Sequence, residues 1–400
     1  MKLQSRETNR IQLRHSSRTR STSSSSSSST SNNAIEATKS IIPQNEASSP
    51  VEIASIEKFL DNIMKEKPIR FTPQQLTEFT NNYSIQLGSG GFGIAYRGSF
   101  PNGVPIAVKV LHKALNKRAE EQFMAEVATI GRTYHIHLVR LYGFCFDPTV
   151  KALVYEFMEN GSLDYYLFSD NLRIEWATLY EIAIGTAKGI RYLHEECEQR
   201  IIHYDIKPGN VLLDKNFSPK VADFGLAKLC NRDVTHVTNT GGRGTPGYAA
   251  PEMWMPLPVT HKCDVYSFGM LLFEILGRRR NLNLGGNESQ EWFPRWVWDK
   301  YENGELGSLA LVCRIEQEGR EKAERMSKLG LWCVQYKPEG RPSMGKVVRM
   351  LEGEEEIMAP PNPFEYMDLY AKELASSTGT MTTTSTISRG STTSTKSIQV

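Results

Sequence analysis

The sequence lacks long apolar runs and has few cysteines. Its six cysteines are scattered among 400 residues and form no Cys-x-x-Cys pair, which argues against a disulfide framework or zinc site and favours a reducing compartment. No apolar run approaches the roughly 18 residues that a membrane-spanning helix needs, and the best candidate, Met270–Leu276, is short and contains Glu274. The second residue is Lys2 rather than glycine, which excludes N-myristoylation.

A strong charge imbalance is also absent. The formal net charge of +2 is too small to indicate nucleic acid as the main partner. From these absences we expect a cytoplasmic protein with no membrane span of its own.

Both ends are poor in core-forming residues. Residues 1–20 are basic, with Glu7 as their single acid, and a serine tract, Ser23–Ser29, follows. We expect residues 1–50 to form a disordered basic and serine-rich tail, although an organelle transit peptide has the same composition and remains an alternative. Residues 356–400 are rich in serine and threonine and predict a second, largely disordered tail.

Residues 51–81 predict two short helices that pack on the main domain as an N-terminal extension. The first shows apolar residues at helical spacing. At the start of the second, Thr72 can cap the helix, Gln75 completes a capping box and Phe71 can pack onto Leu76.

In the rest of the chain, the predicted secondary structure changes once from mainly strands to mainly helices. Residues from about Tyr83 to Asp147 predict short strands with one helix near Arg118–Arg132, whereas about Leu163 to Leu351 predict mainly helices. We therefore expect an α+β fold with a small strand-rich lobe, a larger helical lobe and a cleft at the junction near Tyr155–Gly161.

A glycine-rich segment, Gly88–Gly93, has the spacing Gly-x-Gly-x-x-Gly. Alone this is weak evidence, because dinucleotide-dependent oxidoreductases use the same spacing between a strand and a helix. Here Ile94–Gly98 reads as a strand that leads to a turn at Pro101–Gly103, which favours a hairpin lying over a nucleotide. The Gly-Lys-Ser/Thr sequence of a Walker loop is absent.

The strand around Lys109 predicts a buried cation. Alternation places Ile106 and Val108 on one face and Ala107 and Lys109 on the other. An ammonium group that points into an apolar cleft is costly unless anions meet it. Nucleotide phosphates and a helix carboxylate, best supplied by Glu126, would do so; taken alone, Lys109 is more safely interpreted as an ordinary surface lysine.

Two further segments complete a set of groups for phosphoryl transfer. His203–Asn210 offers a carboxylate for a substrate hydroxyl, and Asn210 with Asp223 offers oxygen ligands for Mg²⁺. The motifs match the protein kinase set in order and approximate spacing: Gly88–Gly93, Lys109, Glu126, His203–Asn210, Asp223–Gly225 and Ala250–Glu252.

The chain thus resembles protein kinases over about residues 82–355, with a small lobe at 82–157 and a large lobe at 158–355. Within that family it is most similar to plant receptor-like kinases of the leaf-rust-resistance-kinase-like group, on the segments Gly241–Glu252 and Thr260–Gly269. The resemblance implies the bilobal kinase fold, ATP and Mg²⁺ as cofactors, and proteins as substrates.

The resemblance also implies roles for individual residues. Asp205 would accept or orient the proton of the attacking hydroxyl, Lys207 would neutralise the γ-phosphoryl group, and Asn210 with Asp223 would hold Mg²⁺. Tyr155 would guard the back of the pocket. The nucleotide would contact Leu87, Gly88, Ser89, Gly90, Gly91, Phe92, Gly93, Ala95, Ala107, Lys109, Glu156, Met158 and Leu212.

Other residues would support this site. Asp264 would hold the backbone of the catalytic loop, and Glu252 would pair with Arg341. A stacked column joining the lobes would consist of Ile130, Leu141, His203 and Phe224.

The segment around Lys207 and Thr245 resembles serine/threonine kinases more than tyrosine kinases, and dual specificity stays open. The activation segment offers phosphate acceptors at Thr235, Thr238, Thr240 and Thr245.

Two residues depart from the family pattern. Tyr204 stands where an arginine usually meets an activation-segment phosphate, so we expect activity to depend less on that phosphorylation. Ala95 stands where valine is usual, and its smaller side chain would weaken adenine packing by about 1 kcal/mol.

Receptor-like kinases usually carry an ectodomain and a membrane span before this domain, and neither occurs here. We therefore expect either a cytoplasmic member or a truncated gene product, recruited to membrane receptor kinases at the plasma membrane. The resemblance suggests a receptor-linked signalling pathway, with defence as one setting. The alternative is a nucleotide-binding pseudokinase scaffold, against which the retained Lys109, Asp205, Asn210 and Asp223 argue. Arg278–Arg280 predicts a solvated loop, and Trp292–Trp298 predicts core aromatics.

Overall fold

The computed structural model describes residues 68–90, 93–112, 117–131, 133–169, 172–232, 244–255, 258–282 and 292–367, all within one compact unit, 48–400. Several predicted features lie outside the described residues: both terminal tails beyond these bounds, the first predicted helix, Gly91, Phe92, Thr235, Thr238 and Thr240.

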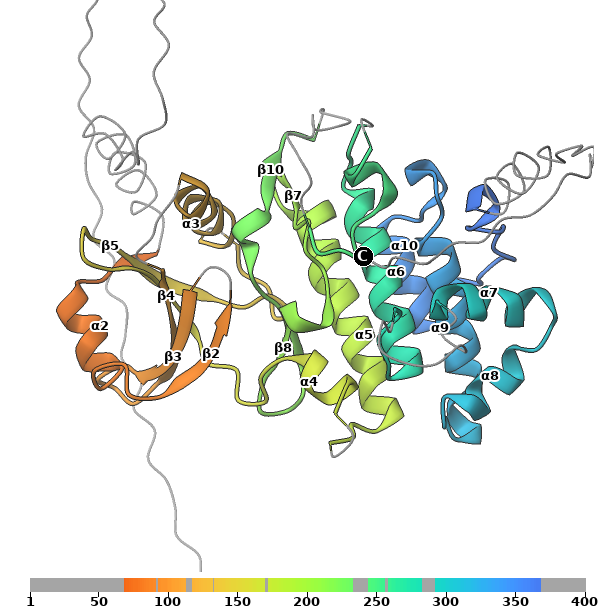
Figure 1. Cartoon of the computed structure of the whole chain (residues 1–400), viewed down its shortest axis with the longest axis horizontal. Coiled ribbons are helices and arrows are strands. Elements are labelled where there is room, and N and C mark those ends of the chain that lie inside the picture. Colours follow the sequence, from red (N-terminus) through yellow and green to blue (C-terminus); the bar gives the residue numbers. More distant parts are fainter. Residues whose placement is uncertain are drawn as a thin grey trace, which may run out of the picture. The chain divides into compact units, whose positions relative to one another are not determined.

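The small lobe is built on a six-stranded sheet in the order β1-β5-β6-β4-β3-β2 (Figure 1). Neighbouring strands are antiparallel except β1 and β5, which are parallel. The elements of this lobe are β1 Ile69–Arg70, α2 Pro73–Phe79, β2 Gln86–Gly90, β3 Gly93–Ser99, β4 Pro105–Leu111, α3 Lys117–Ile130, β5 Leu141–Phe146 and β6 Lys151–Glu156.

The start of α2 confirms the predicted capping box. The backbone N–H of Gln75 donates to Thr72 Oγ1 at 3.2 Å, and the backbone N–H of Thr72 donates to Gln75 Oε1 at 2.9 Å. Phe71 and Leu76 are both buried in one cluster with Ile106 of β4. The segment 68–79 thus packs on the small lobe, as predicted for its helix, and in addition β1 extends the sheet.

The large lobe consists mainly of helices, as expected (Figure 1). They are α4 Leu163–Leu167, α5 Trp176–Arg191, α6 Lys262–Gly277, α7 Phe293–Glu302, α8 Leu306–Val312, α9 Arg320–Cys333 and α10 Met344–Glu352. Helix α6 is buried continuously from Cys263 to Leu276, so it forms the centre of this lobe. A π-helical turn, Tyr192–Glu196, continues α5.

Two small antiparallel pairs of strands lie on the cleft side of the large lobe. They are β7 Arg200–Ile202 with β10 Lys228–Cys230, and β8 Val211–Leu213 with β9 Pro219–Val221. Short 3₁₀ turns lie at Pro208–Asn210, Phe224–Leu226, Pro251–Met253, Gln317–Gly319 and Pro338–Gly340.

The structure places the cysteines and the aromatic stretch as follows. All six cysteines are buried and free of disulfides. In the aromatic stretch Trp292–Trp298, Phe293 and Trp298 are core residues. Across the residues that the structure describes, no helix combines the length and the apolar character that a membrane crossing requires.

Candidate active site

The two lobes meet at a cation with two carboxylate partners. Lys109 Nζ on β4 lies 3.2 Å from Glu126 Oε2 on α3 and 2.9 Å from Asp223 Oδ1 after β9. Strand alternation explains its direction, because Ile106 and Val108 fill the opposite, fully buried face. The structure therefore brings the predicted pair Lys109 and Glu126 together and adds Asp223 to it.

The electrostatics favour a charged Lys109. Burial opposes its positive charge, but the carboxylates of Glu126 and Asp223 outweigh burial and raise its pKa. Burial also opposes the charge of Asp223, yet Lys109 lowers the pKa of that carboxyl below its ordinary value. For Glu126, burial dominates and raises the pKa, although Lys109 and the donating Tyr155 hydroxyl oppose the rise.

Asp205 lies at the centre of a hydrogen-bonded group on the catalytic loop. Its Oδ2 accepts from Lys207 Nζ at 2.7 Å and from Asn210 Nδ2 at 2.9 Å, and its Oδ1 accepts from Thr245 Oγ1 at 2.6 Å. Lys207 Nζ also donates to Thr245 Oγ1 at 2.8 Å. The carboxylate is thus fixed in position while it keeps a small exposed fraction of 7%.

Hydrogen bonds orient the ring of His203. The backbone N–H of Asp205 donates to His203 Nδ1 at 3.2 Å, so this nitrogen is an acceptor. His203 Nε2 lies 3.0 Å from the carbonyl oxygen of Ala222 and must donate to it. His203 therefore links the catalytic loop to the residue before Asp223.

Asp264 on α6 holds the same loop from below. Its oxygens accept the backbone N–H groups of His203 and Tyr204, each at 2.8 Å, and His194 Nε2 lies 2.9 Å away. The first two contacts match the predicted role of Asp264. The contact with His194 was not predicted, because the two residues are 70 positions apart and no motif joins them.

The predicted pair Glu252 and Arg341 forms a buried fork. Arg341 Nη1 lies 2.6 Å from Glu252 Oε1, and Nη2 lies 2.8 Å from Oε2. Arg341 also donates to the carbonyl oxygens of Gln335, Lys262 and Tyr336. Its donors are thus satisfied without water, which anchors the segment that follows the activation loop.

The described residues predicted to surround the nucleotide lie on β2, β3, β4, β6 and β8, except Met158, which follows β6. Leu87, Gly88, Ser89 and Gly90 are exposed, and Ala95, Ala107 and Leu212 are half-buried. Gly93 is required by close packing, because a Cβ there would collide with the backbone of Val110.

In the segment joining the lobes, the contacts of Glu156 limit the backbone groups that can bind the edge of an adenine ring. The backbone N–H of Glu156 already donates to the carbonyl oxygen of Arg140 at 3.1 Å, and the Glu156 carboxylate pairs with Lys220 at 2.8 Å. The backbone N–H of Glu156 is therefore not available to a nucleotide. Met158 is buried beside it.

Asn210 and Asp223 suit a magnesium ion that takes few of its oxygen ligands from the protein. The backbone N–H of Ala222 donates to the Asn210 carbonyl oxygen at 2.9 Å, which places the two residues side by side. Because Asn210 Nδ2 is used by Asp205, its side-chain oxygen is left for a cation. No cluster of three or more His, Cys, Asp or Glu occurs among the described residues, so phosphate and water would supply the remaining ligands.

The residues of the expected stacked column are all buried. The rings of His203 and Phe224 have centroids 4.8 Å apart, and Ile130 and Leu141 are core residues of the same cluster as Phe224. The contact between His203 and Phe224 is thus the part of the expected column that the structure shows directly.

Tyr204 takes the arginine's usual place with its side chain in the core. It is 5% exposed, belongs to the main hydrophobic cluster and has a left-handed φ of 67°. A buried phenol cannot replace the charge of an arginine towards a phosphate.

Comparison with known proteins agrees with this geometry. Residues 82–351 match the family model described as protein tyrosine and serine/threonine kinase. Rust resistance kinase Lr10 of Triticum aestivum is 46% identical over 77% of the chain and 49% of the relative. A leaf rust 10 disease-resistance locus receptor-like protein kinase-like 2.2 of Arabidopsis thaliana is 45% identical, with the same coverages.

A G-type lectin S-receptor-like serine/threonine-protein kinase of Arabidopsis thaliana is 47% identical over 78% of the chain and 36% of that relative. The chain therefore spans about half, or less, of the length of these relatives. The match covers both lobes and every element that carries the cleft. The chain belongs to the protein tyrosine and serine/threonine kinase family, and it has that family's bilobal α+β fold.

Proposed function

We propose that this protein transfers the γ-phosphoryl group of ATP to serine and threonine hydroxyls of proteins. The observation that carries the proposal is the group around Asp205, whose carboxylate is held by Lys207, Asn210 and Thr245. The second half of the site, Lys109 with its carboxylates, lies in the same cleft.

Each group has a chemical task in this proposal. Asp205 accepts or orients the proton of the attacking hydroxyl, which contributes about 10²–10⁴ in rate. Lys109 contacts the phosphate oxygens, and Lys207 offsets negative charge on the transferred group. Asn210 and Asp223 would hold Mg²⁺, which would supply positive charge to neutralise the phosphates.

The contact of Thr245 with both Asp205 and Lys207 supports serine/threonine specificity. Its hydroxyl lies 2.6 Å from Asp205 Oδ1 and 2.8 Å from Lys207 Nζ, so it borders the space that a substrate hydroxyl must enter. The serine/threonine kinase among the relatives points the same way.

We also propose a setting for the activity. The relatives' names include rust resistance and receptor-like kinases, which supports receptor-linked signalling, in defence, with recruitment to membrane receptor kinases. The six buried, free cysteines fit the reducing cytoplasmic side. We keep 82–355 as the proposed bounds of the catalytic domain.

Phosphoamino-acid analysis tests the proposal. The purified chain is incubated with γ-labelled ATP, Mg²⁺ and a generic protein substrate, and the labelled residues are identified after hydrolysis. We expect phosphoserine and phosphothreonine, with labelling lost when Mg²⁺ is chelated. Label on tyrosine alone would refute the specificity, and no label from a protein that ATP stabilises against heat would establish the pseudokinase alternative.

A further inference from the structure

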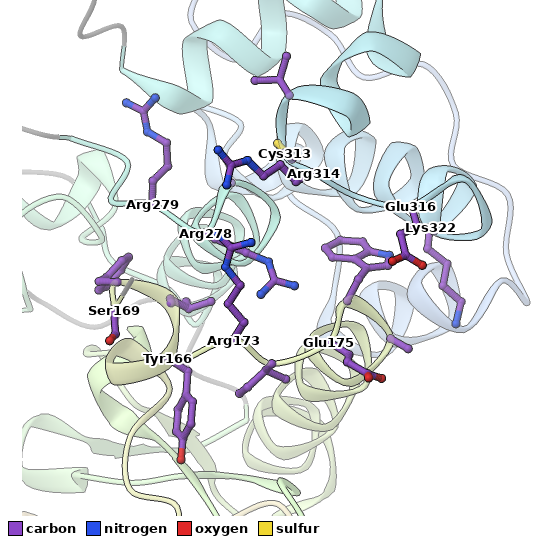
Figure 2. Close-up of a pocket in the computed structure, with 18 of the residues that line it drawn as sticks. Tyr166, Ser169, Arg173, Glu175, Arg278, Arg279, Cys313, Arg314, Glu316 and Lys322 are labelled. Atoms are coloured by element: carbon purple, nitrogen blue, oxygen red, sulfur yellow. The ribbon is translucent and has the colours of Figure 1, made fainter. Parts of the chain in front are cut away.

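A second hollow lies in the large lobe, built from segments that the proposed active site does not use. It has a volume of about 1070 Å³ and is lined by residues at the end of α4 and the start of α5 (Tyr166–Ser169 and Arg173–Ala177), at the end of α6 (Gly277–Arg280) and between α8 and α9 (Val312–Gly319) (Figure 2). We call it the arginine cavity.

Three arginines of this cavity lack a partner of opposite charge. In the part of the chain that the structure describes, the guanidinium groups of Arg173, Arg278 and Arg314 form no ion pair and no side-chain hydrogen bond. Two neighbours, Arg279 and Arg280, lie against the rings of Phe293 and Phe168, at 5.3 and 4.2 Å from the ring centroids. Those contacts orient the guanidinium groups but do not neutralise them.

The backbone holds two of these arginines in an unfavourable conformation. Arg278, at the end of α6, has φ of 48°, and Arg314, just after α8, has φ of 55°. A left-handed conformation costs a residue with a Cβ about 1–2 kcal/mol. Burial and the nearby charge of Arg173 also lower the pKa of Arg278, so the folded chain brings like charges together without offsetting them.

The cavity has an excess of positive charge and an unused donor. Its lining contains six cationic side chains and three acidic ones. Figure 2 shows Glu175 and Glu316 towards the same side as Lys322, and Arg278 with Arg314 in the middle of the view. Trp176 Nε1, which also lines the cavity, is buried and has no acceptor among the described residues.

These donors suit a phosphate monoester. Arginine forms paired, charge-assisted hydrogen bonds with phosphate oxygens, and a phosphorylated side chain brings a charge of about −1.5 to −2 with three acceptor oxygens. We propose that the arginine cavity binds a phosphoserine or phosphothreonine of this chain's own C-terminal tract, Ser376–Ser397.

The described residues end at Met367, close enough to the cavity for the C-terminal tract to reach it. The ring centroids of Phe364 and Trp292 are 4.9 Å apart. The residue after Trp292 is Phe293, and the guanidinium group of Arg279, which lines the cavity, lies over its ring. From Met367 the nine following residues, if extended, reach up to roughly 30 Å. The start of the tract at Ser376 can therefore reach the cavity without moving the folded lobe.

The composition of the tract makes binding depend on phosphate. Residues 376–397 contain 16 serines and threonines, no acidic residue, and the cations Arg389 and Lys396. The unmodified tract and the cavity thus have charge of the same sign, whereas one phosphate, with a charge of about −1.5 to −2, offsets most of the tract's positive charge and brings a local cluster of acceptor oxygens. The inference rests on the proposed kinase function only for the source of the phosphate.

Binding of synthetic phosphopeptides tests the inference. A set of fluorescent peptides spanning residues 376–397, each with one chemically introduced phosphate and together covering all the hydroxyls, is titrated with the phosphatase-treated full chain. We expect at least one peptide to bind at least about tenfold more tightly than its unphosphorylated form. Because the phosphate is introduced by synthesis, the result does not depend on whether the chain transfers phosphate.

A variant of the cavity and a matched control complete the test. The double variant Arg278→Asn/Arg314→Asn removes two cations with a residue that tolerates left-handed backbone, and Arg349→Asn/Arg191→Asn removes two arginines elsewhere on the large lobe. Thermal melting verifies that both fold. We expect the cavity variant to lose the preference for the phosphopeptide and the control to keep it.

Three results would overturn the inference. They are equal affinity for phosphorylated and unmodified peptides, equal loss in both variants, and equally tight binding of singly phosphorylated peptides of unrelated sequence. In the last case the cavity would be a general phosphate site and the tract would not be its specific occupant. Displacement of the peptide by inorganic phosphate only at high concentration agrees with the inference.

Discussion

The cleft and the arginine cavity both gather cations, but they differ in what surrounds them. In the cleft, Lys109 and Lys207 each lie within 3.0 Å of an aspartate oxygen. In the cavity, Arg173, Arg278 and Arg314 have no carboxylate partner among the described residues. The cleft is therefore already ordered by its own charges, while the cavity leaves its charges for an anion from outside the described fold.

The largest expected effect comes from removing the cation that orders the cleft. Lys109→Met removes the cation that joins Glu126 and Asp223 and that we propose contacts the nucleotide phosphates, and we expect phosphoryl transfer to fall by about 10²–10³. Lys220→Met is the matched control, because Lys220 also pairs with a carboxylate near the cleft, that of Glu156 at 2.8 Å. Initial rates at saturating ATP measure both.

We expect the control to stay within about tenfold of wild type, since partly exposed ion pairs contribute only about 0–1 kcal/mol. Similar losses in the two variants would show that the position of Lys109 in the cleft has no special importance.

A second effect concerns stability away from the nucleotide. Arg341→Met leaves the carboxylate of Glu252, which is 1% exposed, buried without its partner, and we expect a loss of about 3–5 kcal/mol in the free energy of unfolding. Urea denaturation measures this loss. The double variant Glu252→Gln/Arg341→Met should lose less, and an equal or larger loss would contradict the pairing argument.

A third, smaller effect appears at acid pH. Burial alone would raise the pKa of Asp264, but hydrogen bonds from His194 and the backbone of His203 lower it below its ordinary value of 3.8. The stabilisation is present above that value and is lost as the pH falls through the lower folded pKa. Asp264→Asn should therefore flatten the acid decline of stability by at most about 1.4 kcal/mol per pH unit; an unchanged slope would contradict this.

The smallest expected effect is a change in the affinity for ATP. Ala95→Val restores apolar surface at the half-buried position that pairs with Lys109 across β3 and β4. We expect ATP to bind more tightly by about 1 kcal/mol, or roughly fivefold. Calorimetric titration with ATP and Mg²⁺ measures this, and weaker binding would show that the valine does not fit.

Much of the cleft could be predicted from the sequence because its contacts follow local patterns and ordered motifs. Alternation gave the direction of Lys109, and the capping box gave the start of α2. The resemblance gave the pairs of Asp264 with the catalytic loop and of Glu252 with Arg341.

Other features have no pattern to reveal them. Strand β1 has two residues and pairs with a strand more than 70 positions later, so it shows no periodicity. The prediction of a solvated loop at Arg278–Arg280 holds for the exposed Arg279 and Arg280, but Arg278 is half-buried in the cavity. Only folding brings it beside Arg173 and Arg314, from separate connections.

The rate of phosphate transfer by Asp205→Asn beside wild type tests the central claim most directly. The substitution keeps the shape of the side chain within its contacts to Lys207 and Asn210 but removes the proton acceptor. We predict that transfer falls by about 10²–10⁴ while stabilisation by ATP and Mg²⁺ is retained. Transfer at the wild-type rate by the folded variant would contradict the assignment of Asp205 as the catalytic carboxylate.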